Sequence, residues 1–178
     1  MWTAYVPNDV LSVAMPRAPL IRPLLIAALI AGLDQLAKAA VASRLDLFEV
    51  IVIVPGLVNL TYIRNTGAAF GLLSGLDPAL TQPIFIGATA LAVVALGYLY
   101  MTAPSGHAWT RWGVALVLGG AVGNLIDRLR LGEVIDFIDL YWGPYHWPAF
   151  NVADSAITIG VALILLESFV RRERVEGG

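Results

Sequence analysis

The stretch ALTQPIFIGATALAVVALGYLYMTAPSG, residues 79–106, carries no charged side chain. An α-helix needs about 20 apolar residues to cross a hydrocarbon core of about 30 Å, and the part near 80–102 supplies them. The whole chain has the same character, because 58% of its 178 residues are hydrophobic and only 13% are charged. A soluble domain carries about 25% charged residues, so the sequence predicts a membrane protein.

Three more segments predict transmembrane helices by the same criterion, near residues 20–41, 109–128 and 150–170. Four spans put both chain ends on one side of the membrane, and the basic cluster at 171–174 favours the cytoplasm. Residues 1–19 are expected to form a cytoplasmic tail, since the apolar run after them continues to Asp34 and Lys38 without a signal-peptide cleavage site. The prediction is an all-α membrane protein with a single membrane-embedded domain over residues 1–178.

A different pattern follows the first span. Residues 48–54, FEVIVIV, are rich in β-branched side chains, Pro55-Gly56 is a turn pair, and residues 57–64 again have strand-like composition. This predicts a β-hairpin in a small extramembrane sheet, with an apolar loop in the membrane interface as the alternative. Between the third and fourth spans, a loop at the membrane boundary is expected because aromatic residues gather there: Phe137, Tyr141, Trp142, Tyr145, Trp147 and Phe150.

Several aspartates lie within or next to the apolar segments of the chain. A charged group in the hydrocarbon costs about 2.5–3.5 kcal/mol on insertion scales, so such residues usually have a function. The four-span layout brings five of them to one membrane face: Asp34, Asp127, Asp136, Asp139 and Asp154. Transport, a structural polar network and a paired-aspartate hydrolase all remain open on this evidence.

Two of these acids have neighbours at helical spacing. Asp34 and Lys38 are four residues apart and are expected to pair on one helix face. Asn124, Asp127 and Arg128 also share a face, and an Asp–Arg pair there predicts a rigid polar scaffold. The small residues Gly119 and Gly123 just before it permit close helix packing.

The last two acids suggest acid–base chemistry. Asn151 is expected to cap the fourth span, which leaves Asp154 in its first turn, held ionised by the positive end of the helix. Asp136 lies among apolar neighbours, which would raise its pKa. A protonated acid that faces an ionised one is the arrangement that general acid–base hydrolysis requires.

Several other functions compete with hydrolysis by two aspartates. Clustered aspartates can hold Mg²⁺ in an enzyme of phospholipid chemistry, and a carrier or channel also needs intramembrane charges. A serine–lysine peptidase would use Ser155 with Lys38, but Asp34 is expected to keep that lysine charged. Cysteine is absent, which excludes thiolate chemistry, and a net charge of -2 gives no sign of nucleic-acid binding.

Four sequence blocks occur in a characteristic order. They are DQLAK at 34–38, RNTGAAFG at 64–71, GGAVGNLIDR at 119–128 running on to GEVIDF at 132–137, and FNVADS at 150–155. Together they resemble the prolipoprotein signal peptidases, also called signal peptidase II, over roughly residues 20–170. Any single block would be weak evidence, whereas four blocks in order are highly specific.

The resemblance implies a bacterial inner-membrane enzyme with four spans, a β-cradle near 45–65 and a short periplasmic helix over 68–76. Such an enzyme cuts diacylglyceryl-modified prolipoproteins before the lipidated cysteine, near the periplasmic face, without metal or cofactor. Its partners would be this substrate and membrane lipids, and a monomer is expected. The catalytic aspartates match Asp136 and Asp154, and the supporting or substrate-binding positions match Asp34, Lys38, Asn65, Gly67, Asn124, Asp127, Arg128 and Asn151.

Overall fold

The computed structural model describes residues 20–67, 78–103 and 106–176. The segment 68–76, expected to form a periplasmic helix, lies outside the described residues. The elements follow one another as α1 (Ile21–Ala42), β1 (Val50–Val54), β2 (Val58–Asn65), α2 (Pro78–Thr102), α3 (Ala108–Leu131), β3 (Val134–Trp142), β4 (Tyr145–His146) and α4 (Val152–Glu176).

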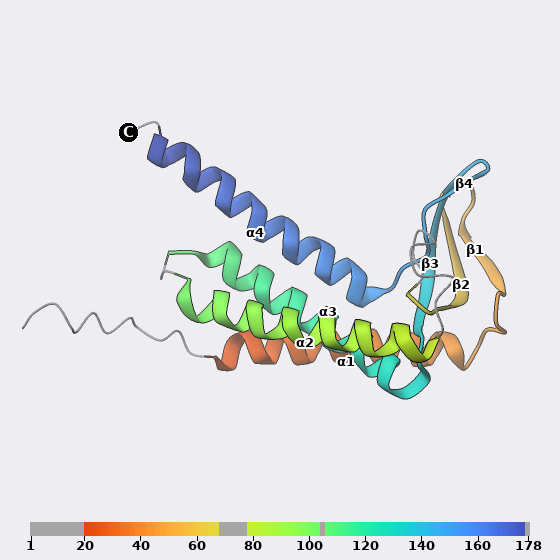
Figure 1. Ribbon diagram of the computed structural model, residues 1–178. Coiled ribbons are helices and arrows are strands. Elements are labelled where there is room, and N and C mark those ends of the chain that lie inside the picture. The colour runs from red at the N-terminus through yellow and green to blue at the C-terminus, as the bar shows by residue number, and fades with distance from the viewer. Residues whose placement is uncertain (1–19, 68–77, 104–105, 177–178) are drawn as a thin grey trace, which may run out of the picture.

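The helices form a bundle, and a small sheet stands at one end of it (Figure 1). Helix α3 is the central helix, since it packs against α1, α2 and α4. Helices α1 and α3 run toward the sheet, and α4 begins beside the sheet and leads away from it (Figure 1). The opposite end of the bundle therefore gathers the start of α1, the end of α2 and the start of α3.

Within the described residues, three helices are long and apolar enough to cross a membrane: Ile21–Ala42, Gln82–Thr102 and Val152–Arg172. Their outward positions carry large apolar side chains, such as Leu29 on α1, Leu91 on α2 and Leu165 on α4, all more than half exposed. Helix α3 is as long but does not belong to this set. Its central position explains the difference, because a helix covered by three others needs small residues for packing more than apolar residues for lipid.

Glycines allow the close packing of α3 that the sequence predicts. A Cβ atom built on Gly119 would lie 2.9 Å from the carbonyl oxygen of Ala27 in α1, and one on Gly123 would lie 2.7 Å from Asp34 Oδ2. A second set faces α4, where a Cβ on Gly113 would lie 2.5 Å from the carbonyl oxygen of Gly160. Small residues on two sides of α3 thus bring both neighbouring backbones close.

The sheet has four antiparallel strands in the order β1-β2-β3-β4. The predicted hairpin is present: Leu57 N–H donates to the Val54 carbonyl at 3.0 Å across Pro55 and Gly56, and Gly56 has a φ of 78°. A proline followed by a residue with positive φ is the pattern of a type II turn. The sequence therefore identified both the strands and the turn of this hairpin.

The prediction of a loop between the third and fourth spans is wrong in part. Residues Val134–Trp142 form strand β3, which pairs with β2 through contacts such as Asn65 with Val134. Most of its side chains are buried, so it lacks the alternation of apolar and polar residues that marks a half-exposed strand. Its aromatic residues suggested a membrane boundary, whereas its position in the sheet depends on pairing with a distant segment.

A small apolar core attaches the sheet to the bundle. It contains Val41 and Leu45 at the end of α1, Tyr62 on β2, and Ile135 and Phe137 on β3, all 6–7% exposed. Because this core joins the end of α1 to both central strands, it fixes β3 against the helices. The strand in turn places Asp136 close to the end of α3 and the beginning of α4.

Candidate active site

A buried ion-pair cluster joins α1 to α3. Lys38 Nζ lies 2.7 Å from Asp34 Oδ2 and 2.8 Å from Asp127 Oδ2, and all three side chains are at most 3% exposed. The Asp34–Lys38 pair has the spacing that the sequence indicates. Asp127 comes from another helix, so two carboxylates share a single ammonium group in the protein interior.

The cluster continues into two asparagines. Lys38 Nζ donates to Asn124 Oδ1 at 2.9 Å, and Asn124 Nδ2 donates to Asp154 Oδ1 at 2.7 Å. Asn151 Nδ2 also lies 3.2 Å from Asn124 Oδ1. The amide of Asn124 therefore turns its donor side toward Asp154, because its acceptor side is occupied by the lysine.

Asp136 is almost completely enclosed, with 2% of its surface exposed. Asn151 Nδ2 donates to its Oδ1 at 2.7 Å, and Asn65 Nδ2 donates to its Oδ2 at 3.0 Å. The pKa of the Asp136 carboxyl is raised to about 6: burial is the main cause and the charge of Asp154 adds to it, while the two hydrogen bonds and the charge of Lys38 act in the opposite direction. The raised pKa that the apolar sequence context predicts is thus present, with desolvation as its main cause.

Asp154 occupies the first turn of α4 in a reciprocal cap. Its backbone N–H donates to Asn151 Oδ1 at 2.9 Å, and the Asn151 N–H donates to Asp154 Oδ2 at 3.3 Å. This exchange is the geometry of a capping box, with asparagine at the cap and an acid three residues later. Asn151 caps the helix as the sequence predicts, and it also contacts Asp136, so one residue links both acids.

Both aspartates line one cavity of about 590 Å³ beside the sheet. The other polar side chains of its lining are Asn65, Arg128, Ser155 and Thr158. Apart from Gly67, the remaining wall is apolar: Phe85, Leu140, Trp147, Pro148, Ala149, Phe150 and Ile159. A largely apolar cavity with a few convergent polar groups and a perturbed pKa is the usual form of a ligand site.

The predicted Asp127–Arg128 pair is wrong. Asp127 binds Lys38 and accepts from Gln35 Nε2 at 2.8 Å, whereas the Arg128 guanidinium lies 4.9 Å from the ring centroid of Phe85. Neighbouring residues on a helix point about 100° apart, so Asp127 faces the ion-pair cluster and Arg128 faces the cavity. Arg128 thus lies in the cavity wall, where the charges of Asp154 and Asp127 act on it without a direct ion pair.

Asp139 does not join the other four acids. It is three residues beyond Asp136 on β3, and an odd separation turns two strand side chains to opposite faces. There it accepts from Asn59 Nδ2 at 2.8 Å and contacts His146 Nδ1 at 2.9 Å. The prediction that grouped Asp139 with the other aspartates assumed that this segment is a loop. Because the segment is a strand, that prediction is wrong.

The contacts of Lys38 and Ser155 do not fit a serine–lysine peptidase. The three N–H donors of Lys38 Nζ bind Asp34, Asp127 and Asn124. Ser155 Oγ donates to the Asn151 carbonyl oxygen at 3.0 Å, one turn earlier in α4. A lysine that acts as a base has to be neutral and within reach of the serine, and Lys38 is instead enclosed by acids.

Some residues of the site carried no separate signal in the sequence. Gln35 donates to the Gly123 carbonyl oxygen at 3.1 Å as well as to Asp127, which ties α1 to α3. Phe85 comes from α2 and contacts the Gly67 region, where a Cβ atom would overlap its ring. Gln35 lies inside the DQLAK block, so the block itself was its only available signal.

The chain is similar to known proteins along most of its length. The sequence model of the family described as Signal peptidase (SPase) II matches residues 26–170. The lipoprotein signal peptidase of Syntrophotalea carbinolica is 50% identical over 80% of this chain and 88% of its own length. That of Geobacter metallireducens is 49% identical over 80% of this chain and 86% of its own length.

Solved structures give the same result at the level of the fold. A bacterial membrane enzyme solved by the in meso method at 1.9 Å has a TM-score of 0.74 and 35% identity, over 84% of this chain and 94% of that one. A second, solved at 2.3 Å, has a TM-score of 0.77 and 32% identity, over 91% and 94%. The resemblance seen in the four sequence blocks is confirmed, and the chain belongs to the signal peptidase II family of aspartic endopeptidases, multi-pass membrane enzymes that remove signal peptides from prolipoproteins.

Proposed function

We propose that Asp136 and Asp154 are the catalytic residues of this peptidase and that its substrates are diacylglyceryl-modified prolipoproteins, cut before the lipidated cysteine. One observation carries the proposal: both carboxylates line the same cavity, and Asn151 is hydrogen-bonded to both. An acid–base pair has to reach the same substrate bond, directly or through one water. Because Asn151 binds both carboxylates, it holds them at the same cavity, which supports the proposal.

The two acids divide the proton transfers. The ionised Asp154 carboxylate takes a proton from water, whose oxygen attacks the scissile carbonyl carbon, while protonated Asp136 gives its proton to the carbonyl oxygen. The resulting tetrahedral intermediate then breaks its C–N bond. The leaving nitrogen receives the proton from Asp154, and an intermediate hydroxyl returns a proton to Asp136. The raised pKa of Asp136 supports its role as the initial acid.

Asn65 and Gly67 are proposed to hold the substrate backbone. Asn65 donates to Asp136 and accepts from the Gly67 N–H at 2.8 Å, so one side chain links the acid to the cavity rim. Gly67 has a φ of 90°, a conformation that other residues rarely adopt. The apolar wall, including Leu140, Trp147 and Ile159, suits the acyl chains of a diacylglyceryl cysteine.

The membrane arrangement is also part of the proposal. Helix α3 would be the fourth span, because its 24 residues reach about 36 Å at 1.5 Å per residue. The sheet and the cavity would then lie at the periplasmic face of the inner membrane, with both chain ends in the cytoplasm. A monomer with lipid around its apolar outer surface is expected.

The test is cleavage of a diacylglyceryl-modified model prolipoprotein by the purified protein, with and without a metal chelator. Cleavage before the modified cysteine at the same rate in both conditions is expected. The same peptide with an unmodified cysteine serves as the control for the lipid requirement. Loss of activity with the chelator would favour metal-dependent chemistry and would contradict the aspartate mechanism.

A further inference from the structure

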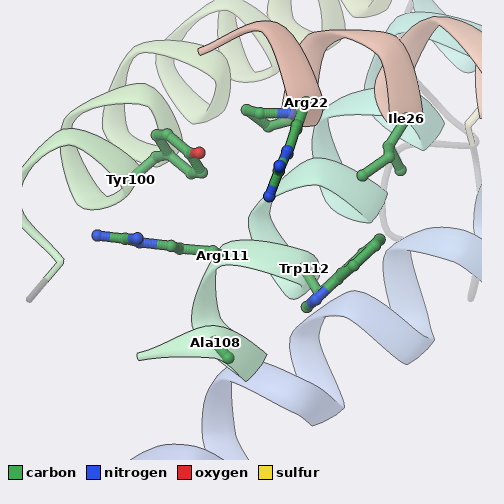
Figure 2. A pocket seen from close by; sticks show the side chains of 7 residues that line it. Arg22, Ile26, Tyr100, Ala108, Arg111 and Trp112 are labelled. Carbon is green, nitrogen blue, oxygen red and sulfur yellow. The ribbon is translucent and has the colours of Figure 1, made fainter. Parts of the chain in front are cut away.

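A second cavity, of about 180 Å³, is seen from close by in Figure 2, and its lining helix ends lie opposite to the sheet in Figure 1. It is enclosed by the start of α1, the end of α2 and the start of α3. Its lining residues include two arginines, Arg22 and Arg111, and no carboxylate. This cavity therefore carries an excess of positive charge and takes no part in the site described above.

Arg22 contributes a charge without a partner. It is exposed in the first turn of α1, and it forms no hydrogen bond or ion pair with any residue in the described ranges 20–67, 78–103 and 106–176. In the view of Figure 2 its side chain extends from α1 toward α3, between Tyr100 and Trp112. Its guanidinium donors are thus directed at the cavity and are free to bind a ligand.

Arg111 has one unmet donor of its own. Its Nη2 donates to the Ala103 carbonyl oxygen at 3.1 Å, and its guanidinium carbon lies 5.9 Å from the ring centroid of Tyr100. Its Nε atom is buried and has no hydrogen-bond partner within the described part of the chain. A buried N–H without an acceptor costs free energy, so the protein does not fully satisfy the guanidinium of Arg111.

The surroundings of the cavity indicate a lipid interface. Trp112 is 56% exposed and Trp109 is 48% exposed at the start of α3, and tryptophan concentrates at the boundary between lipid and water. Ile26 adds an apolar wall on the side of α1. An anion with an apolar portion can contact both the arginines and this apolar surface, whereas a soluble ion can contact only the arginines.

We propose that this cavity binds the phosphate group of an anionic phospholipid from the leaflet at that end of the bundle. Arginine recognises phosphate well, because its planar guanidinium can donate two parallel hydrogen bonds. Basic pockets between transmembrane helices bind the headgroups of acidic lipids in the same way. The acyl chains would extend along the exposed apolar residues of α1, such as Leu25.

The test compares lipids on the purified full-length protein by native mass spectrometry. Phosphatidylglycerol is expected to stay bound when detergent is removed, and phosphatidylcholine, whose choline group the arginines repel, is expected to bind less. Arg22→Gln and Arg111→Gln should each weaken phosphatidylglycerol binding by about tenfold, the usual scale for one charged hydrogen bond. Millimolar inorganic phosphate is expected not to displace the lipid.

The matched control is Arg172→Gln, which removes an equal charge from an exposed position on α4 outside the lining. Equal losses in Arg22→Gln and Arg172→Gln would overturn the site, as would equal binding of the two lipids. Displacement of the lipid by inorganic phosphate would contradict the proposal that the bound phosphate group belongs to a phospholipid. If Arg111→Gln fails to fold, Arg22→Gln decides the result alone, and its peptidase rate in detergent should match wild type.

Discussion

Asp34 Oδ1 accepts a hydrogen bond of 2.9 Å from the backbone N–H of Ala153, the residue immediately before Asp154. The acid of α1 thus holds the first turn of α4 at the point where Asp154 projects into the cavity. A carboxylate at this position is favoured by the free N–H groups and the positive dipole end of the helix. The contact fixes the backbone of Ala153, and therefore it also fixes the position from which the Asp154 side chain projects.

An equivalent contact holds the second aspartate. Asp127 Oδ2 accepts from the backbone N–H of Ile135 at 3.1 Å, and Ile135 immediately precedes Asp136. Lys38 binds Asp34 and Asp127 together, at 2.7 Å and 2.8 Å. The buried cluster therefore joins the two backbone positions that present the proposed catalytic acids, which explains why charged residues occupy this depth.

Asp136→Asn and Asp154→Asn are each expected to reduce cleavage by at least about 10²-fold, because an amide cannot exchange the proton that general acid–base catalysis requires. Both variants should fold, since asparagine has the size of aspartate and can still accept one hydrogen bond. The measurement is the initial rate on a diacylglyceryl-modified substrate, with thermal unfolding of each variant in detergent.

The matched control for this pair is Asp139→Asn. Asp139 lies on the same strand as Asp136, but its carboxylate faces Asn59 and His146 outside the cavity. Its replacement should leave the rate within a few-fold of wild type. A rate for Asp136→Asn or Asp154→Asn that equals that of Asp139→Asn would remove the residue concerned from the catalytic pair.

The pH dependence should show the titration of Asp136. Because burial raises its pKa to about 6, the carboxyl loses its proton as the pH rises through that value, and kcat/KM in the free enzyme should fall on the alkaline side. Asp136→Glu, if it retains activity, should shift this limb. A kcat/KM that stays flat from pH 5 to about 8 would contradict a protonated Asp136 as the initial acid.

The same pKa shift affects stability in the opposite sense to a salt bridge. A carboxyl whose pKa is higher in the folded state binds its proton more tightly there, so folding loses stability as the pH rises from the ordinary value of 3.8 to about 6. Asp136→Asn removes this ionisation. The variant should therefore be as stable as wild type or more stable at pH 7, and equally stable near pH 3.5, in matched thermal scans.

Lys38→Met is expected to destabilise the protein far more than it affects the proton transfers. Methionine fills a similar volume but leaves two carboxylates buried without their cation, and removing one partner of a buried pair costs about 3–5 kcal/mol. Thermal unfolding in detergent measures the loss. The control is Arg44→Gln, because Arg44 is exposed and its replacement should change the melting temperature little.

Ser155→Ala completes this test. Its hydroxyl bonds only to the Asn151 carbonyl oxygen among the contacts that the structure describes, so cleavage should continue at close to the wild-type rate. A Lys38→Met protein that folds normally but is inactive, together with an inactive Ser155→Ala, would restore the serine–lysine mechanism.

The predictable parts of the site are those set by local spacing. Asp34 and Lys38 are one helical turn apart, so their pairing follows from the sequence. The Asn151 cap follows similarly from a residue preference at the start of a helix. The partnership of Lys38 with Asp127 depends on how α1 and α3 rotate against each other, and no local pattern contains that rotation.

Strand β3 shows the same limit for the fold. The β1–β2 hairpin has its own turn at Pro55-Gly56, so its pairing is local. Strand β3 instead pairs with β2 from a distant part of the chain, as in the pairs of Val58 with Leu140 and Ile63 with Asp136. Register between distant strands depends on tertiary packing, and the error at Asp139 followed from missing that strand.

The hairpin should exchange its amide hydrogens unevenly. All five residues of β1 are exposed, whereas Asn59, Thr61 and Tyr62 of β2 are buried. Exchange measured by mass spectrometry should be fast over 48–56 and slow over 58–64, because opening of β1 exposes little apolar surface that the core buries. The β1 segment should become protected when a substrate-like inhibitor is bound. Equal protection with and without the inhibitor would mean that β1 does not close over the bound ligand.

Packing of α3 against α4 should be sensitive to a single methyl group. A Cβ atom on Gly120 would overlap the carbonyl oxygen of Ala153 and lie 2.8 Å from Ile157 Cγ1. Backbone cannot yield as a flexible side chain does, so Gly120→Ala should destabilise the protein by about 1–3 kcal/mol. It should also move Asp154, which follows Ala153, and a displacement of about 1 Å can cost roughly 10²-fold in rate.

Helix α2 offers the matched control for that substitution. Among the described residues, a Cβ atom on Gly87 or Gly97 would meet no atom within 4 Å apart from the backbone of its own helix. Alanine is favoured over glycine by up to about 1 kcal/mol in a helix interior, so Gly87→Ala and Gly97→Ala should be neutral or slightly stabilising and fully active. Thermal unfolding and substrate cleavage, measured side by side, separate the two effects. If Gly120→Ala behaves like these controls, the close approach of α3 and α4 does not position Asp154, and the buried cluster around Lys38 has to do so alone.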